Sequence, residues 1–491
     1  MFGVRASSPS RWAFFIVVSI GLLMVALDNS ILYTALPALN AQLDASPLQS
    51  LWIINAYPLL ITGLLLGTGT LGDRIGHKKM FVAGLLIFGA ASLAAAFAPS
   101  PWALVAARGV LGIGAAAMMP ATLALINQIF TEERERNIAI GIWASAAVVG
   151  AAIGPVVGGL LLEYFWWGSV FFINVPIVLV ALAGTFLLGP PNHPNPAKQW
   201  DATSSLYALI ALSGLTMVIK QVTHPGANLP LIIAALVCAV IGTIAFHRRQ
   251  KKLTDPLLTF DIFRNRVFAG GVLAAIGAMF VLIGMELTST QRLQLVHGFT
   301  PFHAGLATGA VAVVAFPFSI AGGALLERIG FLTITGSGFT VSVLGAALSW
   351  WGSHSGSFAV LLSGFLLIGA GTSFIMSVSS IAIIGAAPPE RAGMAAGVEE
   401  VSYEFGTLIT VAVTGSLLPA VYASLLPPEL QAKGMDAMYD PTTNPLAAPA
   451  YTSAHETVIL FLAVTAAIFG VVTAWCFRDN PTSPVQETHH A

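Results

Sequence analysis

The chain has 491 residues, of which 56% are hydrophobic and only 9% carry a charged side chain. This apolar content exceeds what a soluble core of this length buries, which excludes a soluble globular protein and predicts an all-α integral membrane protein. The formal net charge of -1 excludes a nucleic-acid-binding protein, because phosphate binding requires a clustered excess of Lys and Arg.

Apolar stretches of about 20 residues, the length that crosses a hydrocarbon core of about 30 Å, recur along the whole chain. Fourteen transmembrane helices are expected, at 13–36, 49–71, 80–98, 102–126, 138–161, 169–188, 204–222, 229–247, 267–290, 304–326, 332–352, 358–384, 394–418 and 456–477. An even number of crossings places the N- and C-termini on the same side of the membrane.

The positively charged residues test this number, because an error of one helix would reverse the side of every later loop. With the N-terminus in the cytoplasm, all but four of the 21 Lys and Arg residues fall in cytoplasmic segments. The four exceptions lie in outer halves of expected helices or in outside loops, at Arg108, Lys220, Arg292 and Lys433. Both termini are therefore predicted to be cytoplasmic.

A short charged loop occurs twice between apolar stretches. Gly69-Thr-Leu-Gly-Asp-Arg-Ile-Gly76 is followed by His77-Lys-Lys79, and Gly323-Ala-Leu-Leu-Glu-Arg-Ile-Gly330 repeats its glycine, leucine, acid and arginine positions. Glycines permit a tight reversal, and the charged pair cannot enter hydrocarbon, so each copy marks a membrane–water boundary. The repeat predicts a duplicated transporter body.

Two long cytoplasmic connections, 189–203 and 248–266, isolate one pair of helices from the rest. The expected parts are an N-terminal six-helix bundle (1–188), two additional transmembrane helices with their linkers (189–266), and a C-terminal six-helix bundle (267–491). The last part contains an extracytoplasmic loop at 419–455. Its prolines are compatible with a short helix inside Glu429–Tyr439 or with an unstructured tether.

Several short segments carry a family resemblance: 69–79, Arg108-Gly-Val-Leu-Gly-Ile-Gly-Ala-Ala116, Gly150-Ala-Ala-Ile-Gly-Pro-Val-Val-Gly-Gly159, Ala26-Leu-Asp-Asn-Ser-Ile31, Phe171-Phe-Ile-Asn-Val-Pro176, and Asp255-Pro-Leu-Leu258 with Asp261-Ile-Phe-Arg264. The first three resemble signature motifs of drug–proton antiporters of the major facilitator superfamily, and the others resemble signatures of its fourteen-helix branch. Within that branch the chain most resembles exporters of methyl viologen and quaternary ammonium biocides. The resemblance implies the major facilitator fold, a bacterial inner membrane, and the proton motive force in place of a cofactor.

Acids inside expected helices are candidates for proton coupling and cation binding. An ionised carboxylate at mid-membrane costs on the order of 3 kcal/mol, so Asp28 is expected to be paired, protonated or facing water; the alternative is a structural hydrogen bond to a neighbouring helix. The resemblance implies coupling roles for acids in the last helices, and the whole candidate set is Asp28, Glu286, Glu399, Glu400 and Glu404.

The helical repeat separates three of these acids. Glu400 and Glu404 share one face, whereas Glu399 points elsewhere, and either Glu399 or Glu400 is close enough to the helix end to reach the headgroups instead. Arg108 has two interpretations. Its side chain either snorkels to the outer headgroups or, as the resemblance implies, relays protons or shapes the pocket.

Aromatic residues are expected to complete the pocket, because a quaternary ammonium donates no hydrogen bond and is held by ring faces and a negative charge. The candidates at similar depth are Trp52, Tyr57, Trp143, Phe280, Phe374 and Tyr403. For each one alone, the alternative is contact with lipid or a packing role.

Small residues at Ala146, Gly150, Gly154 and Gly158 form a stripe on the fifth helix that lets another helix approach closely. Pro155 lies beside the stripe and removes a backbone hydrogen bond. The alternative is ordinary packing. The resemblance implies that this motif packs the two halves against each other and is typical of exporters.

The resemblance also implies a gate at the charged loop, formed by Gly69, Asp73, Arg74 and Gly76. The Asp73 carboxylate is expected to cap the N-terminus of the thirteenth helix near Gly393, where the helix dipole favours an anion. Glu327 and Arg328 are the expected, weaker mirror copy.

These features predict a proton-driven antiporter that exports lipophilic mono- and dicationic drugs, dyes and biocides by alternating access, with proton and cation competing for intramembrane carboxylates. Its expected partners are these cations, protons and the lipid bilayer, and a monomer is expected. The alternative is a proton-coupled transporter of a single metabolite, which a fixed Arg or Lys at mid-depth would favour. An enzyme would need a nucleophile–base pair or metal-spaced histidines, and the ten histidines are scattered.

Overall fold

The computed structural model describes residues 8–197, 200–222, 228–253, 256–258, 260–299, 301–388, 391–434, 436–439 and 442–478. Every regular element in these ranges is a helix. Twelve stretches among them are long and apolar enough to cross a membrane. The prediction of an all-helical membrane protein is therefore confirmed.

The helices of the first part pack mainly on one another. α4 packs against α2 and α3, and α1 packs against α5 and α7. Their bounds are α1 Ser8–Leu43, α2 Pro47–Ile75, α3 His77–Ala96, α4 Pro101–Ile129, α5 Glu133–Tyr164, α6 Ser169–Phe172 and α7 Asn174–Leu188.

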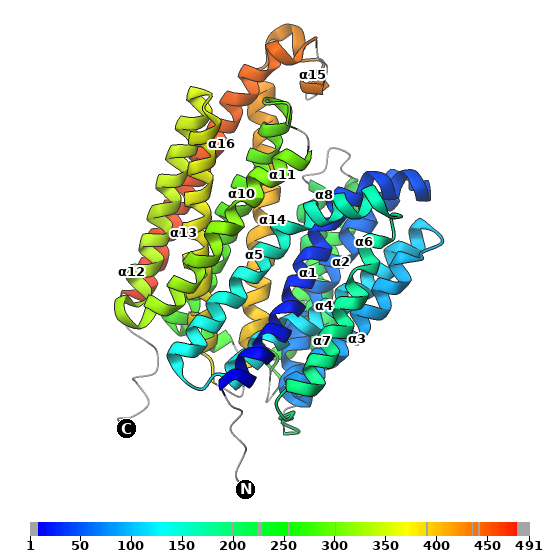
Figure 1. Cartoon of the computed structure of the whole chain (residues 1–491), viewed down its shortest axis with the longest axis vertical. Helices are drawn as coiled ribbons and strands as arrows, with labels where there is room; N and C mark the ends of the chain where they lie inside the picture. The colour runs from blue at the N-terminus through cyan, green and yellow to red at the C-terminus, as the bar shows by residue number, and fades with distance from the viewer. Residues whose placement is uncertain are drawn as a thin grey trace.

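The helices after residue 265 form a second group, in which α10 packs against α13, α14 and α16. Their bounds are α10 Arg266–Leu295, α11 Pro301–Gly309, α12 Val311–Ser355, α13 Phe358–Gly385, α14 Ala392–Leu425, η3 Pro428–Leu430, α15 Asp436–Tyr439 and α16 Asn444–Phe477. Figure 1 shows α1, α3 and α7 on one side of the molecule and α12, α13 and α16 on the other. The two groups touch where α5 meets α12 and where α2 meets α14.

α12 is two antiparallel helices rather than one. The backbone of Gly330 leaves the helical region, with φ 75° and ψ 167°. Before this break Val311 lies beside Gly369, and Gly322 beside Phe374 and Ser377; after it Gly338 lies beside Gly371, and Gly345 beside Gly364. The chain therefore runs parallel to α13 before Gly330 and antiparallel after it, as the expected helices 304–326 and 332–352 require.

Both copies of the charged loop end in a glycine with a backbone that other residues rarely adopt. Gly76 has φ 93° and Gly330 has φ 75°. A positive φ is costly for a residue with a Cβ, which explains why the same position is glycine in each copy. The internal repeat seen in the sequence is thus also a repeat of backbone geometry.

Two further helices, α8 (Ala202–Val222) and α9 (Leu229–Gln250), pack against each other, and α8 packs on α2; a short 3₁₀ helix, η1 (Phe260–Arg264), follows. Ser213 donates a hydrogen bond to the Leu59 carbonyl at 2.9 Å. At the other end of the pair, Arg249 donates two hydrogen bonds, of 2.5 and 2.9 Å, to Asp201. These bonds lower the pKa of the Asp201 carboxyl to about 2.

The expected loop at 419–455 is mostly helical, so its predicted edges were wrong. α14 continues to Leu425, and α16 begins at Asn444. The short helix α15 lies inside the expected range, and its Ala437 and Met438 are buried, which contradicts the alternative of an unstructured tether. The prolines indicated a loop, but one of them stands in the first turn of α16, where its missing N–H costs nothing.

Candidate functional site

A buried ion pair lies at the centre of the first group of helices. Asp28 of α1 is 1% exposed and Arg108 of α4 is completely buried. Arg108 Nη1 donates to Asp28 Oδ2 at 2.6 Å, and Asn174 Nδ2 of α7 donates to Asp28 Oδ1 at 2.7 Å. Of the expectations for Asp28, the paired carboxylate is therefore the one observed.

Arg108 is turned inward and does not snorkel to the membrane surface. Its guanidinium lies 4.3 Å from the centroid of the Tyr57 ring, and its Nε donates to the Ile53 carbonyl at 3.4 Å. The ring face of Tyr57, which we expected to hold a substrate cation, therefore faces Arg108. Phe171 of α6 lies on the other side, 6.0 Å from the guanidinium.

The glycine stripe of α5 packs against α1 and not against the second group, which corrects the partner that the resemblance implied. A Cβ on Gly150 would meet Leu23 and Ala26, on Gly154 it would meet Ser30, and on Gly158 it would meet Ile31. Ser30 also donates to the Gly150 carbonyl at 3.4 Å. The stripe lets the α1 backbone that carries Asp28 approach α5 closely. Pro155 lies within α5, and its side chain is not among those that the structure describes.

A second group of acids lies in α14. Glu399 is completely buried and Glu400 is 4% exposed, so neither reaches the headgroups. Glu399 accepts hydrogen bonds from Ser380 of α13 and from the Tyr403 hydroxyl, the latter at 3.0 Å. Glu399 Oε2 and Glu400 Oε1 accept no hydrogen bond from any described residue.

Glu400 and Glu404 lie on the face of α14 that turns toward α2. Residues 393, 397, 400 and 404 recur every three or four positions and so share one side of the helix. A Cβ on Gly393 would collide with Gly69, and a Cβ on Gly397 would meet the Leu65 carbonyl. Glu404 is half-buried, and both Glu404 and Asp28 interact electrostatically with Tyr57. Tyr57 therefore lies within electrostatic range of acids from both groups of helices.

The contact expected between Asp73 and the start of α14 is present. Asp73 Oδ1 accepts from the Gly393 backbone N–H at 3.0 Å, and it pairs with His77 Nε2 at 3.2 Å. Gly69 permits this approach, because a Cβ there would collide with the Gly393 carbonyl. Arg74 is exposed and is not brought into the contact. The gating role of these residues stays a prediction.

The mirror copy of the loop joins the two groups differently. Ser319 of α12 donates to the Gly141 carbonyl of α5 at 2.5 Å, and a Cβ on Gly323 would collide with the Asn137 carbonyl. Glu327 and Arg328 are both exposed. In the described structure the second copy thus keeps the close glycine contact but not the carboxylate cap.

The remaining aromatic candidates do not form one pocket. Tyr403 lies with Glu399, and Trp143 is buried and donates to Thr122 at 3.0 Å. Trp52 packs on a cluster between α2, α8 and α9, and the Phe280 ring faces Phe461 and Phe469 of α16; the pocket roles of these two residues stay predictions. Phe374 lies against Phe318. The sequence gives the position of each aromatic residue along its helix, but not the side of the helix that meets a neighbour.

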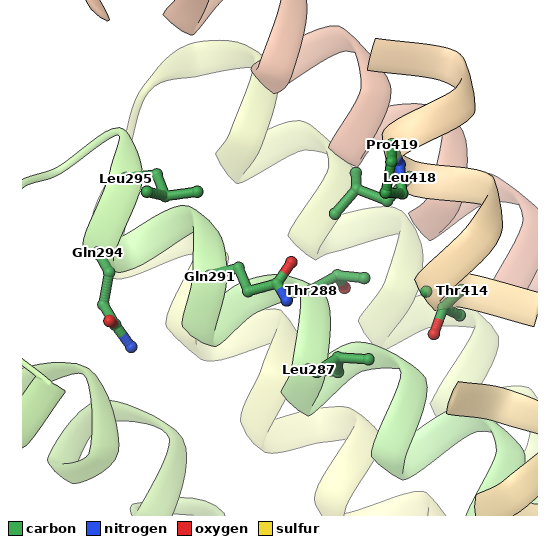
Figure 2. Close-up of a pocket in the computed structure, with 9 residues that line it drawn as sticks. Leu287, Thr288, Gln291, Gln294, Leu295, Thr414, Leu418 and Pro419 are labelled. Atoms are coloured by element: carbon green, nitrogen blue, oxygen red, sulfur yellow. The ribbon is translucent and has the colours of Figure 1, made fainter. Parts of the chain in front are cut away.

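A cavity of about 190 Å³ lies between the outer parts of α10 and α14. Its lining carries amides and hydroxyls but no charge, and comprises Leu287, Thr288, Gln291, Gln294, Leu295, Thr414, Gly415, Leu418 and Pro419. Figure 2 shows Gln291 and Thr288 pointing from α10 toward Thr414 of α14. Glu286, in the same part of α10, is half-buried and does not line the cavity. Sequence reasoning missed this cavity, because neutral polar residues in a helix give no distinctive pattern.

Sequence reasoning also missed the hydrogen-bond partners of the acids. Asn174 binds Asp28, Ser92 lies 3.3 Å from Asn174, and Ser379 lies 3.4 Å from the Tyr403 hydroxyl. The Phe171–Pro176 segment contained Asn174, but nothing in it identified the partner.

Comparisons with known proteins agree with this fold. The sequence model of the Major Facilitator Superfamily matches residues 18–411. The chain is 36% identical over 428 residues to the methyl viologen resistance protein SmvA of Salmonella typhimurium, covering 86% of each chain. It is 34% identical to the multidrug efflux pump LfrA of Mycolicibacterium smegmatis, covering 85% of this chain and 83% of LfrA. The crystal structure of the human organic anion transporter MFSD10 superposes with a TM-score of 0.63 over 93% of this chain and 99% of that one; at 14% identity it shows the fold alone.

Proposed function

This chain belongs to the major facilitator superfamily, and from that premise we propose that it is a proton-driven antiporter exporting lipophilic mono- and dicationic drugs, dyes and biocides. It is a multi-pass membrane protein and a transporter rather than an enzyme. The names of SmvA and LfrA refer to methyl viologen resistance and multidrug efflux, which supports export of such compounds here. The proposal includes fourteen spans arranged 6 + 2 + 6, cytoplasmic termini and the proton motive force as the energy source.

One observation carries the proposal: Glu399 and Glu400 are buried in α14 with no basic partner among the described side chains. An ionised carboxylate in such surroundings is costly unless a proton or a cation neutralises it. The same two carboxylates can therefore be satisfied by either ligand, but not by both together. Glu404, one turn from Glu400 on the same face, extends the acidic surface toward Tyr57.

Competition between the two ligands then couples their movements. When the acids are open to the outside they take protons, and when they are open to the cytoplasm an arriving cation displaces these protons. A dication moves outward against about 2.3 kcal/mol per charge per 100 mV of membrane potential. More than one proton per cycle offsets this cost, and three acids on one helix provide more than one proton site.

Alternating access requires contacts between the two groups of helices that can break. Asp73 with Gly393, and Ser319 with Gly141, are such contacts, and we propose that they close the predicted cytoplasmic end. Among the described residues, each consists of one hydrogen bond between the two groups, over closely packed glycines. Contacts of this size are strong enough to favour one state and weak enough to release it.

The alternative of a transporter for a single anionic metabolite needs a base that is available to the substrate. Arg108 was the mid-depth candidate, but its Nη1 is bound to Asp28 and its face lies on Tyr57. The nitrogen left for a substrate carboxylate is Nη2, which donates to no described residue and is completely buried. The geometry therefore favours cations over anions.

Transport of methyl viologen or ethidium into inverted membrane vesicles under an imposed pH gradient tests the proposal. Glu400→Gln and Glu404→Gln are expected to lose gradient-dependent uptake, whereas Glu429→Gln, at an exposed site outside the spans, serves as the matched control and is expected to keep it. Absence of gradient-dependent uptake by the parent protein would refute the proposed function. Uptake by the parent that both α14 variants retain would refute the assignment of the acids.

A further inference from the structure

The Phe171–Pro176 segment has no role in the mechanism described so far, yet it places a polar side chain beside Asp28. α6 ends at Phe172 and α7 begins at Asn174. Asn174 is completely buried. A buried amide in a membrane helix is costly unless it is hydrogen-bonded, so its bonding pattern is informative.

The two ends of the Asn174 amide are used unequally. Its Nδ2 donates to Asp28 Oδ1 at 2.7 Å and to Ser92 Oγ of α3 at 3.3 Å. Its Oδ1 is buried and accepts no hydrogen bond from any described residue. The amide nitrogen therefore donates to the Asp28 carboxylate, while the amide oxygen remains able to accept a hydrogen bond.

Arg108, the other partner of Asp28, cannot accept a hydrogen bond. A guanidinium has only donors, so it satisfies the ionised form of Asp28 and leaves the O–H of the protonated form without an acceptor. An amide has a donor and an acceptor, and its terminal torsion has a two-fold preference that exchanges their positions. The Ser92 hydroxyl can accept from the amide nitrogen or donate to the amide oxygen, so it accommodates both orientations.

We propose that Asn174 is a positioning residue that provides a hydrogen-bond partner for both protonation states of Asp28, by donating to the carboxylate and, after rotation of the amide, accepting from the carboxylic acid. The proton itself binds to and leaves an Asp28 oxygen, and Asn174 neither gains nor loses one. This inference rests on the proposed proton coupling.

The surroundings of Asp28 contain few other groups that titrate. Arg108 faces it from α4, and Tyr57 of α2 interacts with it electrostatically. The other packed helices contribute Ser92 of α3, Phe171 of α6 and the small residues of α5. A change in pH dependence caused by substitution at Asn174 would therefore report on Asp28 and its pair with Arg108.

The test uses the full-length protein in vesicles and compares two substitutions. Asn174→Leu keeps a similar volume but removes the donor and the acceptor, whereas Asn174→Ser keeps a hydroxyl that provides both. For Asn174→Leu we expect kcat for gradient-driven methyl viologen transport to fall about 10-fold, with KM within about 2-fold because Asn174 does not face the α14 acids. The pH midpoint of transport is expected to move upward, because the charge-assisted bond lost by the ionised carboxylate is stronger than the neutral bond lost by the carboxylic acid. For Asn174→Ser, kcat and the pH midpoint are expected to lie between the values for the parent and for Asn174→Leu.

Thr185→Val is the matched control, because Thr185 is buried in the same helix and bonds only within it, to the Ala181 carbonyl at 2.7 Å. It is expected to leave the pH midpoint unchanged. A parent-like pH midpoint and kcat in Asn174→Leu would overturn the inference, while proton-driven transport by the parent would still support the proposed function. Failure of transport in the parent itself would instead refute the proposed function.

Infrared spectroscopy of the purified protein provides a test that does not depend on transport. The carboxylic acid band that appears on acidification and is absent from Asp28→Asn belongs to Asp28. In Asn174→Leu this band is expected to shift to higher frequency, because the acid loses its acceptor. An unshifted band would overturn the inference even if Asn174→Leu transports too little for kinetics.

Discussion

Asp28 in the first group of helices and Glu399 and Glu400 in the second are all buried, but their partners differ. Asp28 has a guanidinium at 2.6 Å and an amide at 2.7 Å, whereas Glu399 has only hydroxyl partners, and Glu400 Oε1 has none among the described residues. A carboxylate already paired with a fixed base gains little from a substrate cation. Within the proposed function, this difference favours a structural and proton-coupling role for Asp28 and makes the α14 acids the candidates for binding the transported cation.

The largest effect is expected from breaking the Asp28–Arg108 pair on one side only. Arg108→Leu leaves an uncompensated buried carboxylate, which costs on the order of 3–5 kcal/mol. We therefore expect a large fall in thermal stability of the detergent-solubilised protein. Asp28→Asn combined with Arg108→Leu removes both charges and is expected to restore most of the loss. A double variant no more stable than Arg108→Leu would show that the arginine contributes through packing and not through the charge pair.

The opposite result is expected in α14. Glu400→Gln removes a buried carboxylate that has no basic partner among the described residues, so thermal stability is expected to be unchanged or higher, while methyl viologen export falls at least about 10-fold. Stability and transport are measured on the same preparation. A Glu400→Gln protein that is destabilised as strongly as Arg108→Leu would remove the distinction between the two groups of acids.

The two charged loops allow a second, smaller comparison. Asp73→Asn weakens the cap on the Gly393 N–H, a charge-assisted bond for which about 1–2 kcal/mol is typical, and is expected to slow transport several-fold. Glu327→Gln, at the exposed mirror position, is the matched control and is expected to change transport less than 2-fold. Equal effects of the two substitutions would indicate that Glu327 forms a cap in another state of the transport cycle.

Much of this fold could be predicted from the sequence, because hydropathy and helical periodicity depend on residues that are near one another in the chain. The repeated loop predicted the duplication, and the spacing of Glu400 and Glu404 placed them on one face; the side of the membrane that the lysines and arginines give each loop stays a prediction. Helix ends were predicted too short, since hydropathy marks only the apolar part, and α14 and α16 extend beyond it.

Contacts between distant segments were not readable in the same way. Asp28 and Arg108 are 80 residues apart, and Asp28 and Asn174 are 146 apart, so no periodicity connects them. The glycine stripe of α5 predicted a close helix neighbour but could not distinguish α1 from α12. The neighbours of Phe280 on α16 could not be predicted for the same reason, because which helix covers a given face depends on how all the helices pack.

The smallest effect on stability is expected at the Asp201–Arg249 ion pair, which lies near the surface. Both of its hydrogen bonds run from the arginine to the carboxylate. Arg249 is 40% exposed, so solvent screens the pair, and Asp201→Asn is expected to lower the melting temperature by at most about 2 °C. The pKa of Asp201, about 2 in the folded protein, lies below the ordinary value of about 4. The stabilisation that ionised Asp201 provides is therefore fully present above about pH 4 and is lost as the pH falls toward 2.

The difference in melting temperature between the parent and Asp201→Asn should be constant from pH 7 to about 5 and vanish near pH 2. Asp261→Asn, at an exposed acid, is the control. If Asp201→Asn lowered the melting temperature as much as Arg108→Leu does, burial would not be what distinguishes the Asp28–Arg108 pair.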